Sequence, residues 1–367
     1  DQLIIESTGE LDMQEMQLIV SDGAGTDLDC FGTLQLSSVL SVSGTATFES
    51  GCSFLLFTSE IQGPGTVNFM AGSGIDLQGG DKILSGALTL NNYSNLFWGY
   101  SESMTLNSDA IINNYAQINF DNSFSTITAP FGANAQFNNI ASGTITITNS
   151  AIRIENEVQF NNYGNVIVDS ELRLDNNTGT HSGSYTVSQL SELTGTGDIY
   201  FTGSTFTNDG LVALNQLSFA GSGAQQLQGT GTIENFTMNN ATGLTLGGDQ
   251  TFAFSATFAD GIITTGAYKV VLTDGVSLSN SSTSWVYGNM ERQLGVSGSR
   301  TVEFNIGSQT SALPLQLDFS SIDEAGSLLA RTDDGDHTEI LSSGLSVSNS
   351  VNRTWTIENS GMSFSDY

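Results

Sequence analysis

The chain has 367 residues, of which 41 are glycine and only 3 are proline, and charged residues make up just 13% of it. With 38 acidic against 8 basic residues, its formal charge is −30, which repels phosphate backbones and argues against a nucleic-acid-binding protein. No run of about 18 apolar residues occurs, so the sequence predicts no membrane span. Hydrophobic residues make up 38% of the chain and alternate with Ser, Thr and Asn, which favours an all-β, turn-rich fold over disorder.

The N-terminal part of the chain already alternates between apolar and polar positions, for example at positions 34–36 and 39–42. Residues 11–20 could instead form a short helix that caps the end of a repeat array. The N-terminus lacks a basic segment followed by an apolar one, so no signal peptide is expected in this sequence.

The two cysteines, Cys30 and Cys52, are separated by the length of one repeat of the kind described next. Equivalent positions on neighbouring coils of a solenoid are about 4.8 Å apart, within the Cα separation that a disulfide tolerates. We therefore expect the two cysteines to stack. Stacking leaves open whether they form a disulfide or remain two reduced core thiols.

One four-residue phrase recurs along the middle of the chain: an apolar residue, two asparagines and a large apolar residue. It begins at Leu90, Ile112, Phe137 and Phe160, so its spacing is nearly constant. A unit this short, without a helical period, cannot bury its own apolar face and must stack on copies of itself. The sequence therefore predicts a right-handed parallel β-helix with coils of about 22–25 residues over residues 1–285.

The paired asparagines of this phrase have a structural interpretation. Stacked asparagine side chains can hydrogen-bond to one another along the axis of a solenoid, and asparagine tolerates left-handed backbone. Ligand binding by these side chains is the alternative. The internal ladder is the favoured prediction.

A Gly-X-Gly phrase recurs at Gly63, Gly195 and Gly229 and is followed each time by a polar and a β-branched residue. Glycine permits the backbone that a sharp turn between two strands requires. A phosphate cradle would need a helix directly after the glycines, and no helical pattern follows. We interpret these phrases as corners of the coils.

The composition and residue pattern of the sequence change near Trp285. Most of the arginines come later, and the predicted strands become longer, at residues 301–306, 313–319, 327–331 and 353–357. This pattern predicts a small antiparallel β-sandwich-like domain over residues 286–367 that seals the end of the solenoid. Because the sequence stops abruptly at Tyr367, we expect this domain to be truncated and the chain to be a piece of a longer protein.

Several C-terminal phrases resemble those of a known class. Residues 217–231, 239–246 and 260–266 are similar to repeats in large secreted surface proteins of Bacteroidetes, and residues 287–292, 304–307 and 351–357 are similar to the module that follows such repeats. The likeness covers somewhat less than half of the chain well and the N-terminal coils only in texture. It implies an adhesin-like protein on the bacterial cell surface, often a cargo of the type IX secretion system. The implied partners are extracellular glycans or surfaces, the secretion machinery and further domains of the same chain.

Few residues offer catalytic or metal-binding chemistry. His181 and His337 are the only histidines, and neither has a cysteine or second histidine nearby in sequence, so no catalytic triad or zinc site is predicted. The turn of Asp333, Asp334 and Asp336 could bind calcium through carboxylate oxygens, although it lacks the EF-hand spacing. A solvated hairpin loop is the favoured interpretation of this turn, and no other cofactor is expected.

Parallel β-helices also carry polysaccharide lyases and glycoside hydrolases, which need paired carboxylates on one face. Asp27 with Asp29 and Glu155 with Glu157 are such pairs, since alternate residues of a strand share a face. Neither pair lies among basic or aromatic residues in a way that suggests a sugar cleft. The sequence therefore favours a non-catalytic adhesin or stalk, with a carbohydrate-active enzyme as the alternative.

Overall fold

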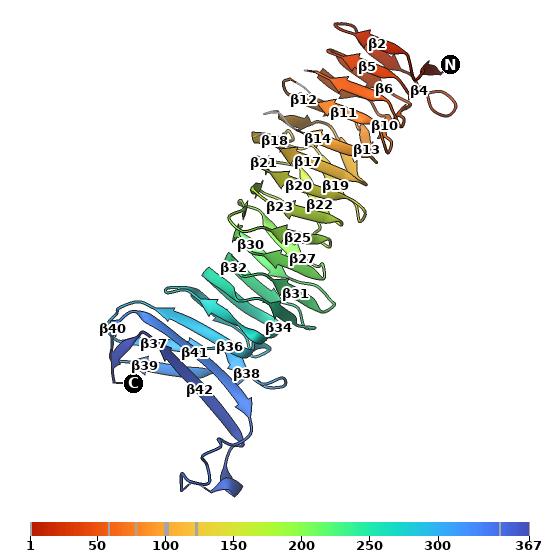
Figure 1. The fold of residues 1–367 in the computed structure, drawn as a ribbon. Coiled ribbons are helices and arrows are strands. Elements are labelled where there is room, and N and C mark those ends of the chain that lie inside the picture. Colours follow the sequence, from red (N-terminus) through yellow and green to blue (C-terminus); the bar gives the residue numbers. More distant parts are fainter. Residues whose placement is uncertain are drawn as a thin grey trace. The chain divides into compact units, whose positions relative to one another are not determined.

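The protein is all-β and forms a parallel β-solenoid with small antiparallel sheets at its C-terminal end (Figure 1). The computed structural model describes residues 2–57, 59–77, 79–98, 103–121, 124–344 and 346–366, and these contain no α-helix. The chain divides into two compact units, one of residues 1–199 and 213–215 and one of residues 200–212 and 216–367. The predicted fold class is confirmed.

The first unit is built from three stacks of short parallel strands. Each coil contributes one strand to each stack, except that the last coil has no strand in the first stack. The first stack contains β1 (Leu3–Ile5), β4 (Leu28–Cys30), β7 (Thr45–Phe48), β10 (Thr66–Phe69), β13 (Thr89–Asn92), β16 (Ile111–Asn114), β19 (Gln136–Asn139) and β22 (Gln159–Asn162). The second contains β2 (Glu10–Met13), β5 (Thr33–Leu36), β8 (Ser53–Leu56), β11 (Gly74–Leu77), β14 (Asn95–Trp98), β17 (Gln117–Asp121), β20 (Thr144–Thr148), β23 (Asn165–Val168) and β25 (Ser184–Val187). The third contains β3 (Leu18–Val20), β6 (Val39–Val42), β9 (Ser59–Gln62), β12 (Lys82–Ser85), β15 (Met104–Leu106), β18 (Phe124–Thr128), β21 (Ala151–Ile154), β24 (Glu171–Leu174) and β26 (Glu192–Thr194).

The recurring phrase stacks residue upon residue, as predicted. Leu90, Ile112, Phe137 and Phe160 are register partners in successive coils, and all four side chains are buried. Because side chains alternate across a strand, each coil contributes apolar residues to one continuous interior and polar residues to the outer surface. No coil could bury these side chains alone.

Residues 11–20 form strands rather than a capping helix. They contain most of β2 and all of β3, which pair in parallel with β5 and β6 of the next coil. Pairing satisfies the backbone of this segment along one edge, so the helical alternative is wrong.

The second asparagine of each phrase points inward and forms a buried ladder. Asn92 donates from Nδ2 to Oδ1 of Asn114 at 2.8 Å, Asn114 donates to Asn139 at 2.9 Å, and Asn139 donates to Asn162 at 2.9 Å. Each amide also donates to a backbone carbonyl that begins a strand of the second stack, as Asn139 does to Asn165 at 2.9 Å. The inner ladder therefore fixes the corner between the first two stacks.

The first asparagine of each phrase points outward and forms a second ladder of opposite direction. Asn91, Asn113, Asn138 and Asn161 each donate to the asparagine of the preceding coil, at 2.8–3.0 Å, and the ladder begins at Asn68. The predicted asparagine ladder is thus confirmed as two ladders. Left-handed asparagines occur elsewhere, at turns such as those of Asn149, Asn156 and Asn176.

The Gly-X-Gly phrases lie at corners, as predicted. A Cβ atom at Gly63, Gly195 or Gly229 would overlap the backbone carbonyl oxygen of Val42, Leu174 or Asn208 respectively. Gly195 and Gly229 also have positive φ angles, of 125° and 85°, whereas Gly63 does not. Close approach of two coils, rather than backbone conformation alone, therefore requires glycine at these corners.

The second unit contains further parallel coils, in which β32, β34 and β36 are longer than the strands of the first unit. It contains β28 (Thr205–Asn208), β30 (Gln216–Phe219), β31 (Gln225–Gln228), β32 (Thr232–Asn239), β33 (Leu244–Gly247), β34 (Gln250–Leu272), β35 (Ser277–Asn280) and β36 (Ser284–Leu294), while β27 (Asp198–Phe201) and β29 (Leu211–Ala213) have residues of both units. Aromatic rings fill the interior, as where Phe236 stacks on Phe252 with ring centroids 4.0 Å apart.

The antiparallel sheets follow within the second unit. They comprise β37 (Arg300–Phe304), β39 (Leu315–Phe319), β40 (Ser321–Glu324), β41 (Gly326–Asp334), β42 (Arg353–Ser360) and β43 (Ser363–Ser365); β38 (Ile306–Gly307) and a single 3₁₀ turn, Val347–Asn349, complete the fold. Trp285 lies inside β36, which pairs in parallel with β34 and β38 and antiparallel with β41. Strand β36 therefore has both parallel and antiparallel partners, close to the residue where the residue pattern of the sequence changes.

Candidate functional site

A disulfide joins Cys30 and Cys52, whose Cα atoms lie 5.6 Å apart. The two residues are not equivalent positions of neighbouring coils, because the register partner of Cys30 is Phe48. The expectation of a one-repeat offset is wrong here, since the coil between β4 and β7 is shorter than those that carry the asparagine phrase. The bond instead links the end of β4 to the turn that precedes β8.

Asp333, Asp334 and Asp336, the predicted calcium ligands, have separate partners. Asp333 and Asp334 end β41, where Arg331 donates to Asp333 at 3.2 Å and Arg353 pairs with Asp334. Asp336 accepts a hydrogen bond from Ser350. Across the described ranges, no three His, Cys, Asp or Glu side chains gather in a group that could hold a metal ion. The structure therefore does not bring these three carboxylates together.

His181 is fully buried, although its sequence neighbours are typical of an exposed loop. Its Nδ1 atom lies 2.7 Å from the hydroxyl of Tyr185, and its Nε2 atom lies 3.2 Å from Oδ1 of Asn177. His181 is the register partner of Asn162, so its ring occupies the next step of the inner asparagine ladder. Burial lowers the pKa of His181 to about 4, which keeps the imidazole neutral.

We expect the stability of the first unit to fall as the pH decreases from about 6.5 to about 4. The unfolded chain binds a proton on His181 near the ordinary pKa of 6.5, whereas the folded chain does so only near 4. Above about pH 6.5 the neutral imidazole makes its full contribution to the free energy of unfolding. This contribution, about 3 kcal/mol in total, is lost as the pH falls from about 6.5 to about 4. Urea unfolding at a series of pH values measures it, and His181→Asn, which retains a ladder amide, provides the control. An equal pH dependence in the variant would contradict this assignment.

The first predicted carboxylate pair is divided between a buried corner and the outer surface. Asp27 is only 7% exposed and accepts a hydrogen bond from the backbone N–H of Thr45 at 2.8 Å. Asp29 accepts from Nε2 of Gln2 at 2.5 Å, and burial raises its pKa. Asp27 thus braces a corner between two coils, while Asp29 lies on the outside of β4.

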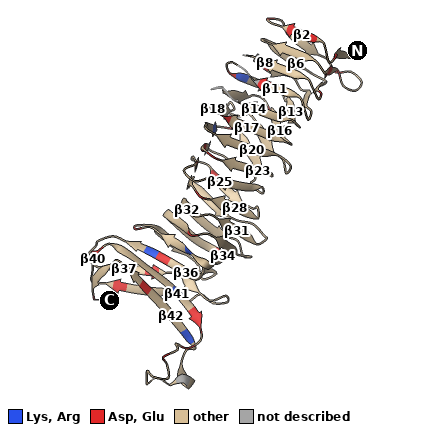
Figure 2. Cartoon of the chain, viewed as in Figure 1, with Lys and Arg blue, Asp and Glu red and all other residues tan. Residues whose placement is uncertain are grey.

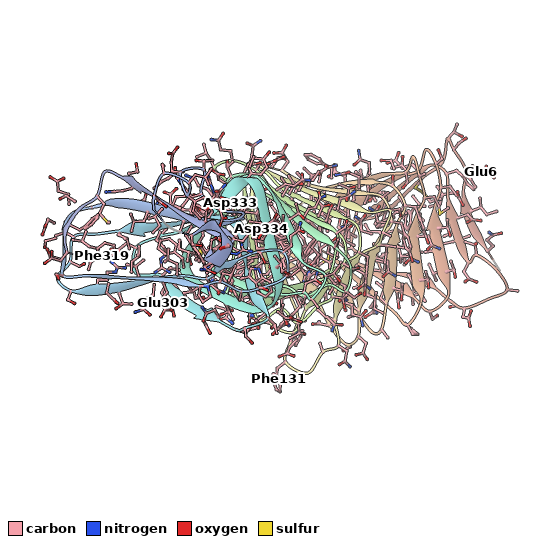
Figure 3. The ribbon with its side chains drawn as sticks, turned by 90° about the horizontal axis from the view of Figure 1, so that it is seen from below. Glu6, Phe131, Glu303, Phe319, Asp333 and Asp334 are labelled. Atoms are coloured by element: carbon pink, nitrogen blue, oxygen red, sulfur yellow. A yellow bond between two sulfur atoms is a disulfide. The ribbon has the colours of Figure 1, made fainter. Side chains whose placement is uncertain are left out.

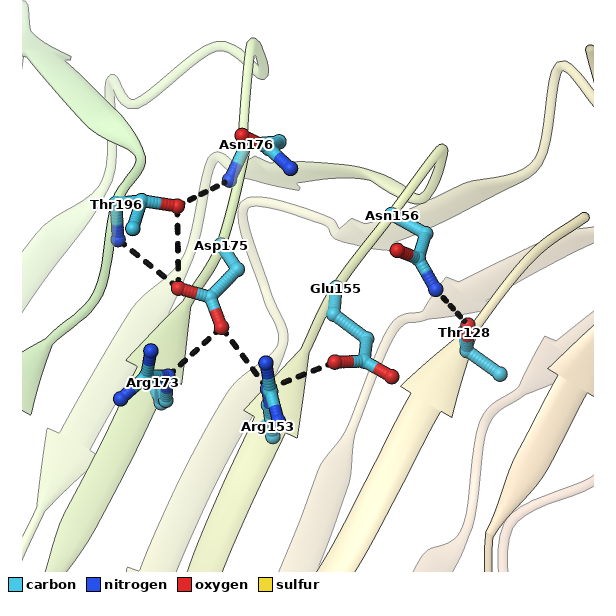
Figure 4. Close-up of polar contacts among 8 residues, drawn as sticks. All are labelled: Thr128, Arg153, Glu155, Asn156, Arg173, Asp175, Asn176 and Thr196. Atoms are coloured by element: carbon cyan, nitrogen blue, oxygen red, sulfur yellow. Dashed lines mark hydrogen bonds and ion pairs between the residues drawn. The ribbon is translucent and has the colours of Figure 1, made fainter. Parts of the chain in front are cut away.

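The second pair leads to a charged cluster that was not predicted from the sequence (Figure 4). Arg153 of β21 and Arg173 of β24 are register partners in neighbouring coils. Both donate from Nε to Oδ2 of Asp175, at 2.9 and 2.7 Å, and Arg153 also pairs with Glu155 at 2.7 Å. The signal in the sequence is an Arg-apolar-acid phrase that begins at Arg153 and recurs one coil later at Arg173.

Asp175 is the centre of this cluster. Its side chain is 7% exposed, and its Oδ1 atom accepts from the backbone N–H of Thr196 at 2.9 Å. Burial alone would raise the pKa of Asp175, but hydrogen bonds from Arg173, Thr196 and Arg153 lower it to about 2. A carboxylate that stays ionised and fully hydrogen-bonded near neutral pH neither gives nor takes a proton there. The cluster is therefore suited to clamping three coils rather than to acid–base catalysis.

The outer surface of the coils in the first unit is mainly polar and uncharged, with charged residues in isolated patches (Figure 2). Among the described residues, no helix has the length and apolar character needed to cross a membrane. No family model matches the chain, and neither a curated protein nor a solved structure matches it.

Proposed function

We propose that this chain is a non-catalytic contact module of a secreted cell-surface protein, acting as an adhesin or stalk. The observation that carries the proposal is the continuous cross-coil bonding of the first unit. Three stacks of parallel strands, two asparagine ladders and the Asp175 clamp tie each coil to the next. Such bonding makes a stiff surface on which identical positions recur at about 4.8 Å.

The residues on that surface suit contact with other molecules. Most outward positions of the first stack carry Thr, Gln and Asn side chains, for example Thr66, Thr89 and Gln136, and Ile111 interrupts this row between Thr89 and Gln136. Hydroxyl and amide groups both donate and accept hydrogen bonds, which suits glycans. A repeated polar face supports binding of an extended partner rather than turnover of a small one.

Two further features support an extracellular location. The Cys30–Cys52 disulfide is typical of oxidising compartments. The C-terminal phrases resemble those of secreted Bacteroidetes surface proteins, which supports export by a type IX secretion system and a place on the cell surface.

Incubating the purified chain with a panel of polysaccharides tests this function, with retention of the protein and the appearance of new chain ends measured in the same samples. We expect retention without cleavage. New reducing or unsaturated ends would favour the polysaccharide lyase or glycoside hydrolase alternative and overturn the non-catalytic proposal. Retention is the result that distinguishes a binding surface from a passive spacer.

A further inference from the structure

The last residue of the recurring phrase belongs neither to the buried apolar row nor to either asparagine ladder. In each coil the phrase places an apolar side chain inward, one asparagine outward, one asparagine inward and a large apolar residue at the corner before the second stack. The backbone N–H groups of Tyr93, Tyr115, Ile140 and Tyr163 each bond to a carbonyl of the preceding coil at 2.8–2.9 Å, so these residues occupy one row. Tyr93 and Tyr163 are 36% and 40% exposed. Four successive coils thus keep a large apolar group where the interior does not use it.

Met70 extends this row by one coil, because its backbone N–H bonds to the carbonyl of Phe48 at 2.9 Å. The outer asparagine ladder covers the same five coils, from Asn68 to Asn161. We call the two rows together the corner strip: the outward asparagine and the corner residue of each coil, from Asn68 and Met70 to Asn161 and Tyr163. At about 4.8 Å per coil, the strip is about 20 Å long.

We propose that the corner strip is the binding site for a neutral, extended polysaccharide chain that lies along the coils, a step that rests on the proposed function. Its amide row retains hydrogen-bonding capacity at the partly exposed Asn91 and Asn113, which each use one N–H and one oxygen lone pair in the ladder and have a second of each. Asn138 and Asn161 are buried, so contact there falls to the corner row. Its corner row offers rigid aromatic surface at three of the five coils, and the rings of Tyr93 and Tyr115 stack with centroids 4.6 Å apart. Hydroxyl groups and apolar C–H faces recur along a sugar chain at a spacing close to that of the coils.

Charge selects between neutral and ionic glycans. Neither row of the corner strip contains a charged residue, although the chain carries a formal charge of −30. An anionic polysaccharide would meet no counter-charge on the strip and would be repelled by the rest of the protein. A polycation would be attracted to the acidic surface elsewhere rather than to the strip. A neutral chain is the occupant that the strip fits.

Binding of defined oligosaccharides to the full chain, measured by calorimetry, tests this proposal. Cellohexaose and laminarihexaose are the neutral probes, and hexagalacturonate is the anionic one. We expect a neutral hexasaccharide to bind, with an affinity independent of salt, and the variant Tyr93→Ala/Tyr163→Ala to lose about tenfold or more in affinity. The matched control is Phe131→Ala. Phe131 is 96% exposed and projects from the loop before β19, at the opposite end of the first-stack strands (Figure 3). Thermal unfolding checks that both variants fold.

The outcomes separate this proposal from the function on which it rests. Binding that the tyrosine variant retains in full would overturn the corner strip and leave the contact function intact. Preferential binding of hexagalacturonate would overturn the neutral assignment. Self-association of the chain that the tyrosine variant abolishes, without saccharide binding, would assign the strip to contact between copies. If no saccharide binds and no copies associate, the corner strip is overturned and the chain acts as a stalk.

Discussion

Replacing Asn114 by alanine is expected to destabilise the first unit by about 3–5 kcal/mol. The Asn114 side chain is fully buried and lies in the middle of the inner ladder. It accepts from Asn92 at 2.8 Å and donates to Asn139 at 2.9 Å and to the carbonyl of Thr144 at 3.1 Å. Alanine removes all three of these hydrogen bonds from the interior, although Asn92 still donates to the carbonyl of Gln117. Each buried polar group left unsatisfied costs about 1–3 kcal/mol. Urea or thermal unfolding of the purified chain measures the loss.

The neighbouring asparagine provides a control of identical chemistry. Asn113 lies on the same strand and bonds to Asn91 and Asn138, at 2.9 Å in each case, but it belongs to the outer ladder. Because the Asn113 side chain is partly exposed and Asn114 is fully buried, we expect Asn113→Ala to cost about 1 kcal/mol or less. Equal losses of stability in the two variants would show that the number of ladder hydrogen bonds, and not burial, sets the free-energy cost. That result would contradict this account.

The contrast between Asn113 and Asn114 also shows what the sequence could predict. The recurring phrase predicted the stacking of coils, because four apolar residues at similar offsets have only one way to share an interior. It also predicted an asparagine ladder, and alternation along a strand implies that adjacent asparagines face opposite sides. The opposite direction of the two ladders was not predictable, since it depends on which backbone carbonyls lie near each amide at the corner.

The register near the N-terminus was not predictable from spacing. Cys30 pairs with Phe48, whereas Leu90 pairs with Ile112, and the first of these pairs encloses a shorter stretch of chain than the second. The difference lies in the turns, whose lengths vary without changing the strands. A single repeat length therefore cannot predict the register partner of a cysteine, even though the two cysteines do form a disulfide.

The candidate site was predicted least well. Arg153 and Arg173 belong to different strands, and only the coil length in that region makes them neighbours. The burial of His181 was also hidden, because its Gly, Ser and Thr neighbours are typical of loops and the signal is its place in the ladder. Polar side chains that bond between coils reveal themselves only when the register is known.

Replacing Gly63 by alanine is expected to destabilise the first unit by about 3 kcal/mol or more. Gly63 lies at the corner where its coil passes the backbone of Val42, and an added Cβ would overlap the Val42 carbonyl oxygen. That same oxygen accepts the N–H of Gly65 at 2.9 Å, so the carbonyl cannot move away without breaking a bond between coils. The φ angle of Gly63 is not positive, so the expected loss comes from this close approach rather than from backbone strain. Thermal unfolding measures it.

Gly74→Ala is the matched control, because it makes the same chemical change without the overlap. The nearest atom to a Cβ at Gly74 is the carbonyl oxygen of Cys52, at 3.7 Å, which is ordinary van der Waals contact. Gly74 also lies in β11 without a positive φ angle. Alanine there restricts the unfolded chain more than the folded one, so the stability should stay the same or rise by up to about 1 kcal/mol. If both variants lost stability equally, the loss would come from replacing glycine by alanine in general. It would not come from the close approach of two coils at Gly63.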